Sequence, residues 1–142
     1  AYEQGLDVQV VASPAVTMDQ VRELCEPDWI EGWYSITDFV STTDDEEVQA
    51  FCEKYASDYG DGQNAELYVA DVYSSVKLLA DAIERAGSAD RDAIRDALAE
   101  TQGFQMLQGE ANCDENNSFI HSATVARIED YTPVYYTTVE AE

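Results

Sequence analysis

The side chains that could perform catalysis are few and scattered. The single histidine, His121, has no serine or cysteine in a nucleophile-elbow context, and no glycine-rich phosphate loop occurs. Cys25, Cys52 and Cys113 lack both C-x-x-C spacing and a histidine cluster, which argues against zinc. At most one disulfide can form among them, and the sequence leaves their pairing open. We therefore predict no enzyme activity and no cofactor or metal.

Two oxygen-rich segments could bind a cation. Asp114, Asn116 and Ser118 have the spacing that begins a calcium loop, but they lack its sixth-position glycine and distal glutamate. Residues 58–64 are similarly rich in oxygen ligands. Both segments are predicted to be solvated turns, and a calcium-stabilised surface domain is kept as an alternative.

Aromatic side chains offer a different chemistry, which is binding without reaction. Tyr68, Tyr73, Trp33 and Tyr34 combine apolar bulk with a hydrogen-bonding tip, a combination that suits a small-molecule cleft. Tyr68 and Tyr73 fall near the start of a long predicted helix, away from its main apolar stripe. They predict a pocket wall there, with packing at the edge of a core as the alternative.

These side chains must be positioned by a mixed set of elements. Thr43 and Glu46 form a capping-box pattern before a helix that Gly60 ends, and Ser88 is placed to cap a later helix. Periodicity predicts strands at residues 7–12, 32–40, 104–106, 119–128 and 134–139, and helices at residues 17–25, 43–59, 67–86 and 89–99.

The order of these elements indicates an α/β fold with an unusual division. The middle of the chain is purely helical, whereas most strands lie in its outer thirds. The outer thirds are therefore expected to build one layered system, and the middle to belong to another. The longest helix carries Val72, Val76, Leu79 and Ile83 on one stripe, which must be buried somewhere.

Charge excludes several partners. Seven Lys and Arg residues against 30 Asp and Glu residues give a net charge of −23. Nucleic acids and anionic membrane surfaces both require a basic face, so neither is an expected partner. No apolar run is long enough for membrane insertion, and Ala1 is followed by neither a basic nor an apolar leader segment. This start indicates a cleaved or truncated product.

Several short runs together resemble the periplasmic leucine/isoleucine/valine-binding protein family. They occur in that family's order across residues 1–139. The runs are Ile30-Glu31-Gly32-Trp33-Tyr34, Phe51-Cys52-Glu53-Lys54-Tyr55 with Tyr59-Gly60, Val72-Tyr73 through Ile83 with Ala86-Gly87-Ser88, Ile94 through Leu98, and Gly103 through Gly109 with Ala111 to Asn117.

The resemblance implies the C-terminal part of a two-lobed type I periplasmic-binding-protein fold. It assigns residues 1–38 to the second lobe, 39–42 to a hinge crossover and 43–112 to the helical part of the first lobe. A second crossover follows at residues 113–121, and residues 122–142 supply the C-terminal strands of the second lobe. It also implies that the missing N-terminal part of the receptor, or a second copy of the chain, covers the helical stripe.

Ligand-contacting positions can be transferred only where the sequences match. Tyr68 matches an aromatic residue that packs on the ligand, and Tyr73 lies five residues later. Ser13, Thr17 and Asp19 belong to a loop whose acidic residue receives the ligand ammonium in amino-acid binders. The nearest match to that acid is Ala15, and Asp19 is displaced. Amides, small carboxylic acids and aromatic acids are therefore open alternatives to an α-amino acid.

The function implied is capture of a small molecule between two lobes. The chain would serve as the extracytoplasmic solute-binding component of an ABC importer, with the permease as its partner and a lipid anchor at the missing N-terminus as one means of attachment. Alternatives are a ligand-sensing receptor ectodomain of the same fold and an acidic structural surface domain.

Overall fold

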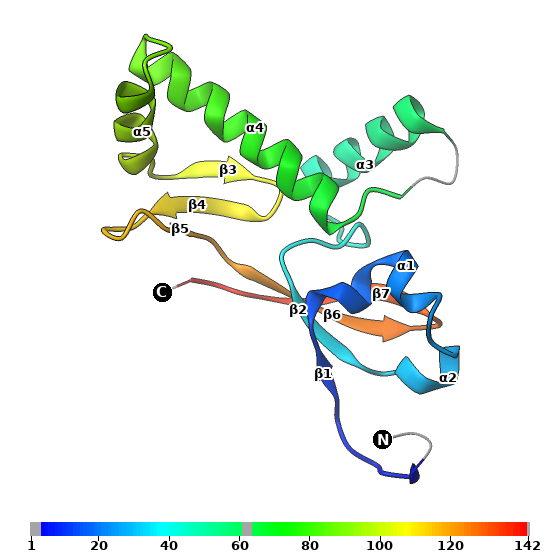
Figure 1. The fold of residues 1–142 in the computed structure, drawn as a ribbon. Helices are drawn as coiled ribbons and strands as arrows, with labels where there is room; N and C mark the ends of the chain where they lie inside the picture. The colour runs from blue at the N-terminus through cyan, green and yellow to red at the C-terminus, as the bar shows by residue number, and fades with distance from the viewer. Residues whose placement is uncertain (1–3, 61–63, 142) are drawn as a thin grey trace. The chain divides into compact units, whose positions relative to one another are not determined.

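The computed structural model describes residues 4–60 and 64–141. It confirms the α/β class, and the chain forms two compact units (Figure 1). The first unit comprises Ala1–Leu67 and Ala123–Val139, and the second comprises Tyr68–Ser122 and Glu140–Glu142. The assignment of residues 1–38, 43–112 and 122–142 to the two lobes stays a prediction.

The first unit is built on a four-stranded sheet with the order β1-β2-β6-β7. Its strands are β1 (Val11–Ala12), β2 (Tyr34–Thr37), β6 (Ala123–Glu129) and β7 (Thr132–Val139). The β1–β2 pair is parallel, and the other pairs are antiparallel. Asp130 and Tyr131, both with positive φ, make the tight turn between β6 and β7. The last strands of the chain therefore complete the sheet that the first strands begin.

Short helices cover this sheet and fix its loops. They are the 3₁₀ helix η2 (Pro14–Thr17), α1 (Asp19–Arg22) and α2 (Pro27–Ile30). Val16, Ile30 and Ile128 form a buried cluster, with Trp33 and Tyr131 packed against it. The predicted helix at 17–25 was wrong in extent, because Met18 is extended and separates η2 from α1.

The longer helix α3 (Glu46–Tyr59) also belongs to the first unit. Its N-cap is Asp45, whose Oδ1 accepts from the backbone N–H of Glu47 and Val48, each at 3.0 Å. The predicted Thr43 cap was wrong, since the Thr43 hydroxyl accepts instead from the Asp45 N–H. Gly60 ends the helix with φ +115°, as the sequence predicts.

The second unit combines two helices with a small antiparallel sheet. Helix α4 (Leu67–Ala86) has the predicted bounds and begins at the boundary between the units, and α5 (Arg91–Ala99) follows it. The N-cap of α5 is Asp90 rather than Ser88, whose hydroxyl accepts from the Asp90 N–H. The sheet consists of β3 (Phe104–Met106), β4 (Gly109–Cys113) and β5 (Phe119–Ile120).

Helix α4 has apolar residues on two faces. One face, with Ala70, Ser74, Leu78 and Ala82, is buried. The other face, with Val72, Val76, Leu79 and Ile83, is between 39% and 63% exposed. We call these four residues the α4 stripe. A helix that is apolar on both faces is normally buried on both. Because the α4 stripe is exposed, no part of residues 4–60 and 64–141 covers it completely.

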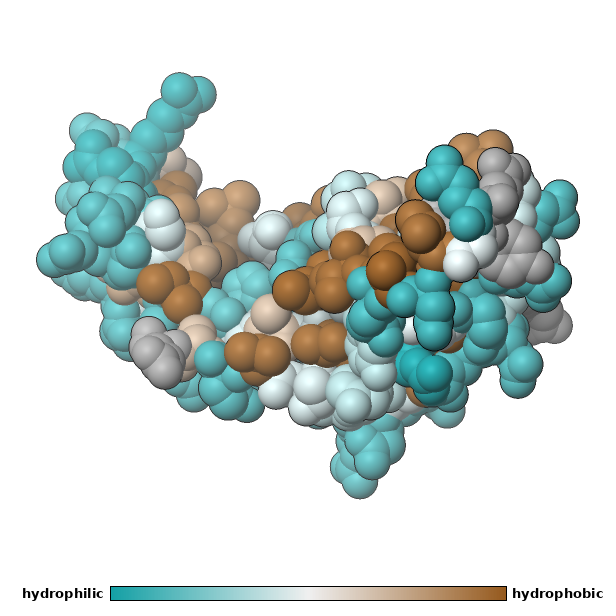
Figure 2. All heavy atoms as spheres, turned by 90° about the horizontal axis from the view of Figure 1, so that it is seen from below, coloured by the Kyte–Doolittle hydropathy of each residue, from teal (hydrophilic) through white to brown (hydrophobic). Residues whose placement is uncertain are grey.

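Apolar side chains are also exposed elsewhere on the surface. Leu6, Val8 and Val11, at or before β1, are each more than half exposed. Figure 2, which views the molecule from below, shows apolar side chains at the surface between hydrophilic ones. Because β1 is an edge strand of only two residues, most of the predicted strand at 7–12 is unpaired among the described residues.

Other element boundaries differ in detail from the predictions. The predicted strand at 32–40 is limited to Tyr34–Thr37, and the strand at 119–128 is divided into β5 and β6. Strand β4 was not predicted. The turn at 114–118 is present, since Asp114 Oδ1 accepts from the backbone of Asn116 and Ser118. The predicted turn at 58–64 includes residues 61–63, which lie outside the described residues.

Candidate functional site

A cavity of about 190 Å³ lies within the first unit. It is formed by four segments that are distant in sequence. Its lining consists of Thr17, Asp19 and Arg22 with residues 39–42, 64–67 and 132–133. Two of the five predicted ligand-contacting residues, Thr17 and Asp19, therefore line one cavity. Whether they contact a ligand there stays a prediction.

The break between η2 and α1 positions these two residues. Thr17 is 8% exposed, and its hydroxyl donates to the Pro14 carbonyl at 2.8 Å, which closes the 3₁₀ turn. Met18 is extended, and Asp19 becomes the first residue of α1. An acidic side chain at a helix start is favoured by the exposed N–H groups there.

Arg22 is a charged residue of this cavity that sequence reasoning missed. Its side chain is 9% exposed and forms an ion pair with Asp19, and one guanidinium nitrogen donates to the Thr17 carbonyl at 2.5 Å. The centre of the Tyr131 ring lies 6.0 Å from the guanidinium carbon of Arg22. The Tyr131 hydroxyl donates to the Arg22 backbone carbonyl. Among the described residues, Arg22 Nε is buried without a hydrogen-bond partner. Arg22 thus holds η2, α1 and the β6–β7 turn together.

Glu66 is the second charged residue that sequence reasoning missed. It is half-buried just before α4, and its Oε1 accepts from the Asp19 backbone N–H at 2.6 Å. This bond joins residues separated by 47 positions. The i, i+3 spacing of Asp19 and Arg22 was a local signal for their pair. No local pattern indicates the contact of Glu66.

The other predicted residues lie outside the lining of this cavity. The Ser13 carbonyl accepts from the Ser35 hydroxyl at 3.1 Å, which fixes the loop to β2. Tyr68 and Tyr73 belong to the second unit and are 61% and 42% exposed. The Lys77 ammonium lies 5.4 Å from the centre of the Tyr73 ring. That Ser13, Tyr68 and Tyr73 contact a ligand stays a prediction.

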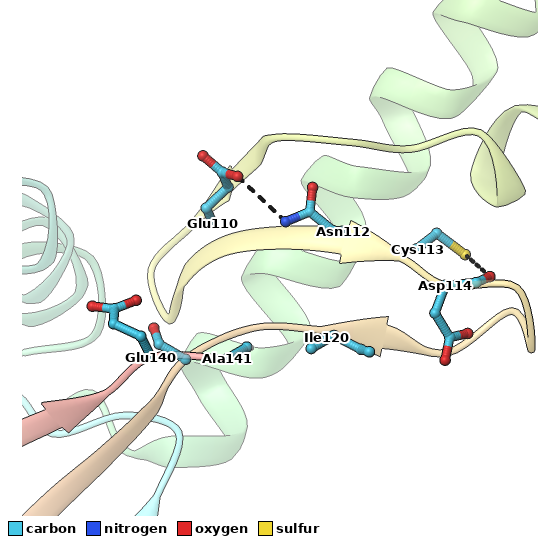
Figure 3. A pocket seen from close by; sticks show the side chains of 8 residues that line it. Glu110, Asn112, Cys113, Asp114, Ile120, Glu140 and Ala141 are labelled. Carbon is cyan, nitrogen blue, oxygen red and sulfur yellow. Dashed lines mark hydrogen bonds between the residues drawn. The ribbon is translucent and has the colours of Figure 1, made fainter.

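A second pocket, of about 410 Å³, lies in the second unit along β4 and β5. Figure 3 shows Glu110, Asn112 and Asp114 on the β4 side and Glu140 with Ala141 opposite. Asn112 donates to Glu110 at 3.3 Å, and the Cys113 thiol donates to the Asp114 carbonyl at 3.8 Å. Within the described part of the chain, no three His, Cys, Asp or Glu side chains are grouped to hold a metal ion.

Comparison with known proteins identifies the family. The family model described as periplasmic binding protein matches residues 1–132. No curated protein matches the chain. Among the described residues, no helix is both long and apolar enough to cross a membrane.

Solved structures show the fold over nearly the whole chain. A leucine-binding protein from Thermotoga maritima is 26% identical, with a TM-score of 0.85 over 99% of this chain and 39% of its own. A branched-chain amino acid transporter substrate-binding protein from Streptococcus pneumoniae, in complex with isoleucine, is 20% identical, with a TM-score of 0.80 over 99% and 39%. A solute-binding protein of an ABC transporter from Rhodopseudomonas palustris, in complex with 3,4-dihydroxybenzoic acid, is 17% identical, with a TM-score of 0.79 over 99% and 40%.

The chain spans about two fifths of the length of these proteins. The resemblance to the leucine/isoleucine/valine-binding proteins, and the type I periplasmic-binding-protein fold that it implies, are both confirmed. Since the family model covers 132 of its 142 residues, this chain belongs to the periplasmic binding protein family.

Proposed function

We propose that this chain is part of an extracytoplasmic solute-binding component of an ABC importer. The observation that carries the proposal is the structural match of 99% of the chain to solute-binding proteins of such transporters. The protein acts by capture and performs no catalysis. Its ligand is a small amino-acid-like, amide or aromatic-acid molecule.

The cavity of the first unit supports a binding role. It combines a buried hydroxyl residue, Thr17, with three charged side chains, Asp19, Arg22 and Glu66, and with the apolar residues Phe39 and Leu67. Ligand sites typically combine an apolar lining with a small number of polar groups that orient the ligand. Tyr68 and Tyr73 would supply a further wall when the lobes close.

The proposed mechanism is a population shift between open and closed states. A ligand that contacts both lobes binds the closed state more tightly and stabilises it, and the permease recognises that state. Hinge motion would be absorbed by residues 39–42 and 113–121, which the resemblance assigns to crossovers between lobes.

The α4 stripe supports the proposal that the rest of a longer polypeptide completes the receptor. Four large apolar residues on one exposed helix face form a surface that water solvates poorly. The missing N-terminal part of the receptor would cover this face. A second copy of the chain is the alternative cover.

The test is ligand binding by the full-length protein. Isothermal titration calorimetry would use L-leucine, L-isoleucine, acetamide, benzoate and 3,4-dihydroxybenzoate as the first panel. Binding of at least one compound with micromolar or tighter affinity is expected. Absence of binding to every compound, in protein that melts cooperatively, would count against a transport role for these ligand classes.

A further inference from the structure

The turn between β4 and β5 carries a sequence motif that the proposed function does not use. Asn116-Asn117-Ser118 has the pattern N-x-S, in which the middle residue is not proline. This tripeptide is the acceptor for N-linked glycosylation in proteins that leave the cytoplasm. Of the four asparagines in the chain, only Asn116 is followed two positions later by Ser or Thr, since Phe119 holds that position after Asn117. The motif therefore nominates a single side chain.

The motif lies at an accessible position of the fold. Asn116, Asn117 and Ser118 are all exposed, and their turn forms the end of the hairpin that β4 and β5 make (Figure 1). Asn117 has φ +60°, a left-handed conformation that helps to reverse the chain within a few residues. A glycosylating enzyme must reach the Asn116 amide and the Ser118 hydroxyl together. An exposed turn presents both groups without any helix or strand having to unfold.

The turn is held by groups other than the Asn116 and Ser118 side chains. Asp114 Oδ1 accepts from the backbone N–H groups of Asn116 and Ser118, each at 2.8 Å. The Asp114 N–H donates to the Ser118 carbonyl at 2.9 Å, and the Asn117 N–H donates to the Asp114 carbonyl at 3.1 Å. Among the described residues, Asn116 Nδ2 makes only a 3.4 Å hydrogen bond to Asp114 Oδ2, and the Ser118 hydroxyl makes none. Both side chains are therefore available for a reaction that leaves the turn intact.

We propose that Asn116 is an N-glycosylation site, with Ser118 as the hydroxyl residue that the glycosylating enzyme recognises. This inference rests on the proposed function, because the motif is used in proteins exported from the cytoplasm. The co-substrate is an activated sugar, namely a glycosyl phosphate or diphosphate carried by a membrane lipid. Asn116 Nδ2 forms a bond to the anomeric carbon of the sugar, and the bond from that carbon to the phosphate oxygen breaks. The amide nitrogen loses one proton to a base of the enzyme, and the lipid phosphate leaves with the electron pair of the broken bond.

A purely structural role for these residues makes a different prediction. Asparagine is common in turns because it tolerates the left-handed conformation and its side chain bonds to nearby groups. That role sets no condition on the residue two positions later. Glycosylation does set one, because it needs a hydroxyl there. Ser118→Ala and Ser118→Thr therefore separate the two roles, since only the second variant keeps the hydroxyl.

The experiment is mass spectrometry of the full-length protein purified from its source organism. Trypsin releases residues 96–127 as one peptide, since no Lys or Arg lies between Arg95 and Arg127. We expect this peptide to carry the added mass of sugar residues, and fragmentation to place that mass on Asn116. Asn116→Gln and Ser118→Ala, each expressed in the same organism, should lose the added mass completely. The matched control Ser118→Thr should keep it.

Three results would overturn the inference. They are a wild-type peptide without added mass, sugar located on a residue other than Asn116, and sugar that persists in Ser118→Ala. The first two need no variant, so they remain decisive if a substitution impairs folding. Fractionation of the same cells separates this inference from the proposed function. Unmodified protein found outside the cytoplasm refutes only the glycosylation site, whereas protein found in the cytoplasm refutes the proposed function as well.

Discussion

The α4 stripe gives the sharpest test of whether further structure covers this chain. Val72 and Val76 are adjacent on that stripe and are 63% and 62% exposed. Replacing both by alanine in the full-length protein removes apolar carbon atoms from the stripe without adding polarity. Helix α4 itself should persist, because alanine favours helix more than valine does.

The expected magnitude depends on what the two valines face. Each substitution removes two methyl groups, and each methyl group contributes about 0.8 kcal/mol to the free energy of unfolding when it is fully buried. Alanine in turn favours the helix over valine by roughly 0.5 kcal/mol per residue. If both valines are as exposed as they are here, the small loss of buried apolar area is nearly offset by the gain in helix propensity. The free energy of unfolding would then barely change. With the stripe fully covered, the double variant should lose about 2 kcal/mol.

Urea unfolding followed by circular dichroism would measure this difference. Leu78→Ala, on the buried face of α4, is the control and should lose about 2 kcal/mol or more in either case. We expect a loss near 2 kcal/mol for Val72→Ala with Val76→Ala. A loss close to zero, with the Leu78 control behaving as expected, would refute the proposal that the rest of a longer polypeptide covers this face.

Three further outcomes are expected. Tyr68→Ala in the full-length protein should weaken ligand binding by about 10- to 100-fold in calorimetry without lowering the melting temperature, and unchanged affinity would remove Tyr68 from the proposed site. Gly109→Ala should be more destabilising in urea than Gly87→Ala, because both glycines have positive φ but only at Gly109 would a Cβ meet another side chain, Ser122 Oγ at 2.7 Å; equal losses would contradict this account. Hydrogen bonds from the backbone N–H of Ser118 and then of Asn116 lower the pKa of Asp114 in the folded protein. The ionised Asp114 side chain therefore stabilises the fold above its unfolded-state pKa, and this stabilisation is lost as the pH falls through its folded-state pKa. Thermal melts should therefore show wild type more stable than Asp114→Asn near neutral pH and this advantage shrinking below about pH 4; a difference that does not change with pH would oppose it.

The local parts of the fold were predictable from the sequence. Helix α4 has the predicted bounds because its apolar period is long and Gly87 follows it. The caps were less predictable, since Thr43 and Asp45, or Ser88 and Asp90, compete within one turn. In both pairs the aspartate is the N-cap, and its carboxylate accepts two backbone N–H bonds.

Elements that depend on distant partners were not predictable. Strand β4 contains Gly109 and Asn112, which have low strand propensity, and it forms because β3 and β5 pair with its two edges. The predicted strand at 7–12 is shortened because β1 lies at the edge of its sheet and pairs with only one strand, β2, among the described residues.

In the candidate site, too, residues with a local sequence signal were predictable, and residues that depend on distant contacts were not. Thr17 and Asp19 could be nominated because they lie in one loop that resembles a ligand-contacting segment. Glu66 could not, because its importance comes from a hydrogen bond across 47 residues. Arg22 was overlooked because an arginine near an acidic residue usually forms a surface pair, whereas here the guanidinium is buried.

The discontinuity of the first unit has a consequence for biosynthesis. Its sheet has the order β1-β2-β6-β7, so β2 gains its second neighbour only after residues 123–129 have been made. During translation, β1 and β2 cannot be enclosed before β6, which begins 86 residues after the end of β2, has emerged from the ribosome. Contacts of such large sequence separation form slowly. The first unit therefore remains incompletely folded until β6 has been synthesised, and its unpaired strand edges stay accessible to chaperones during that interval.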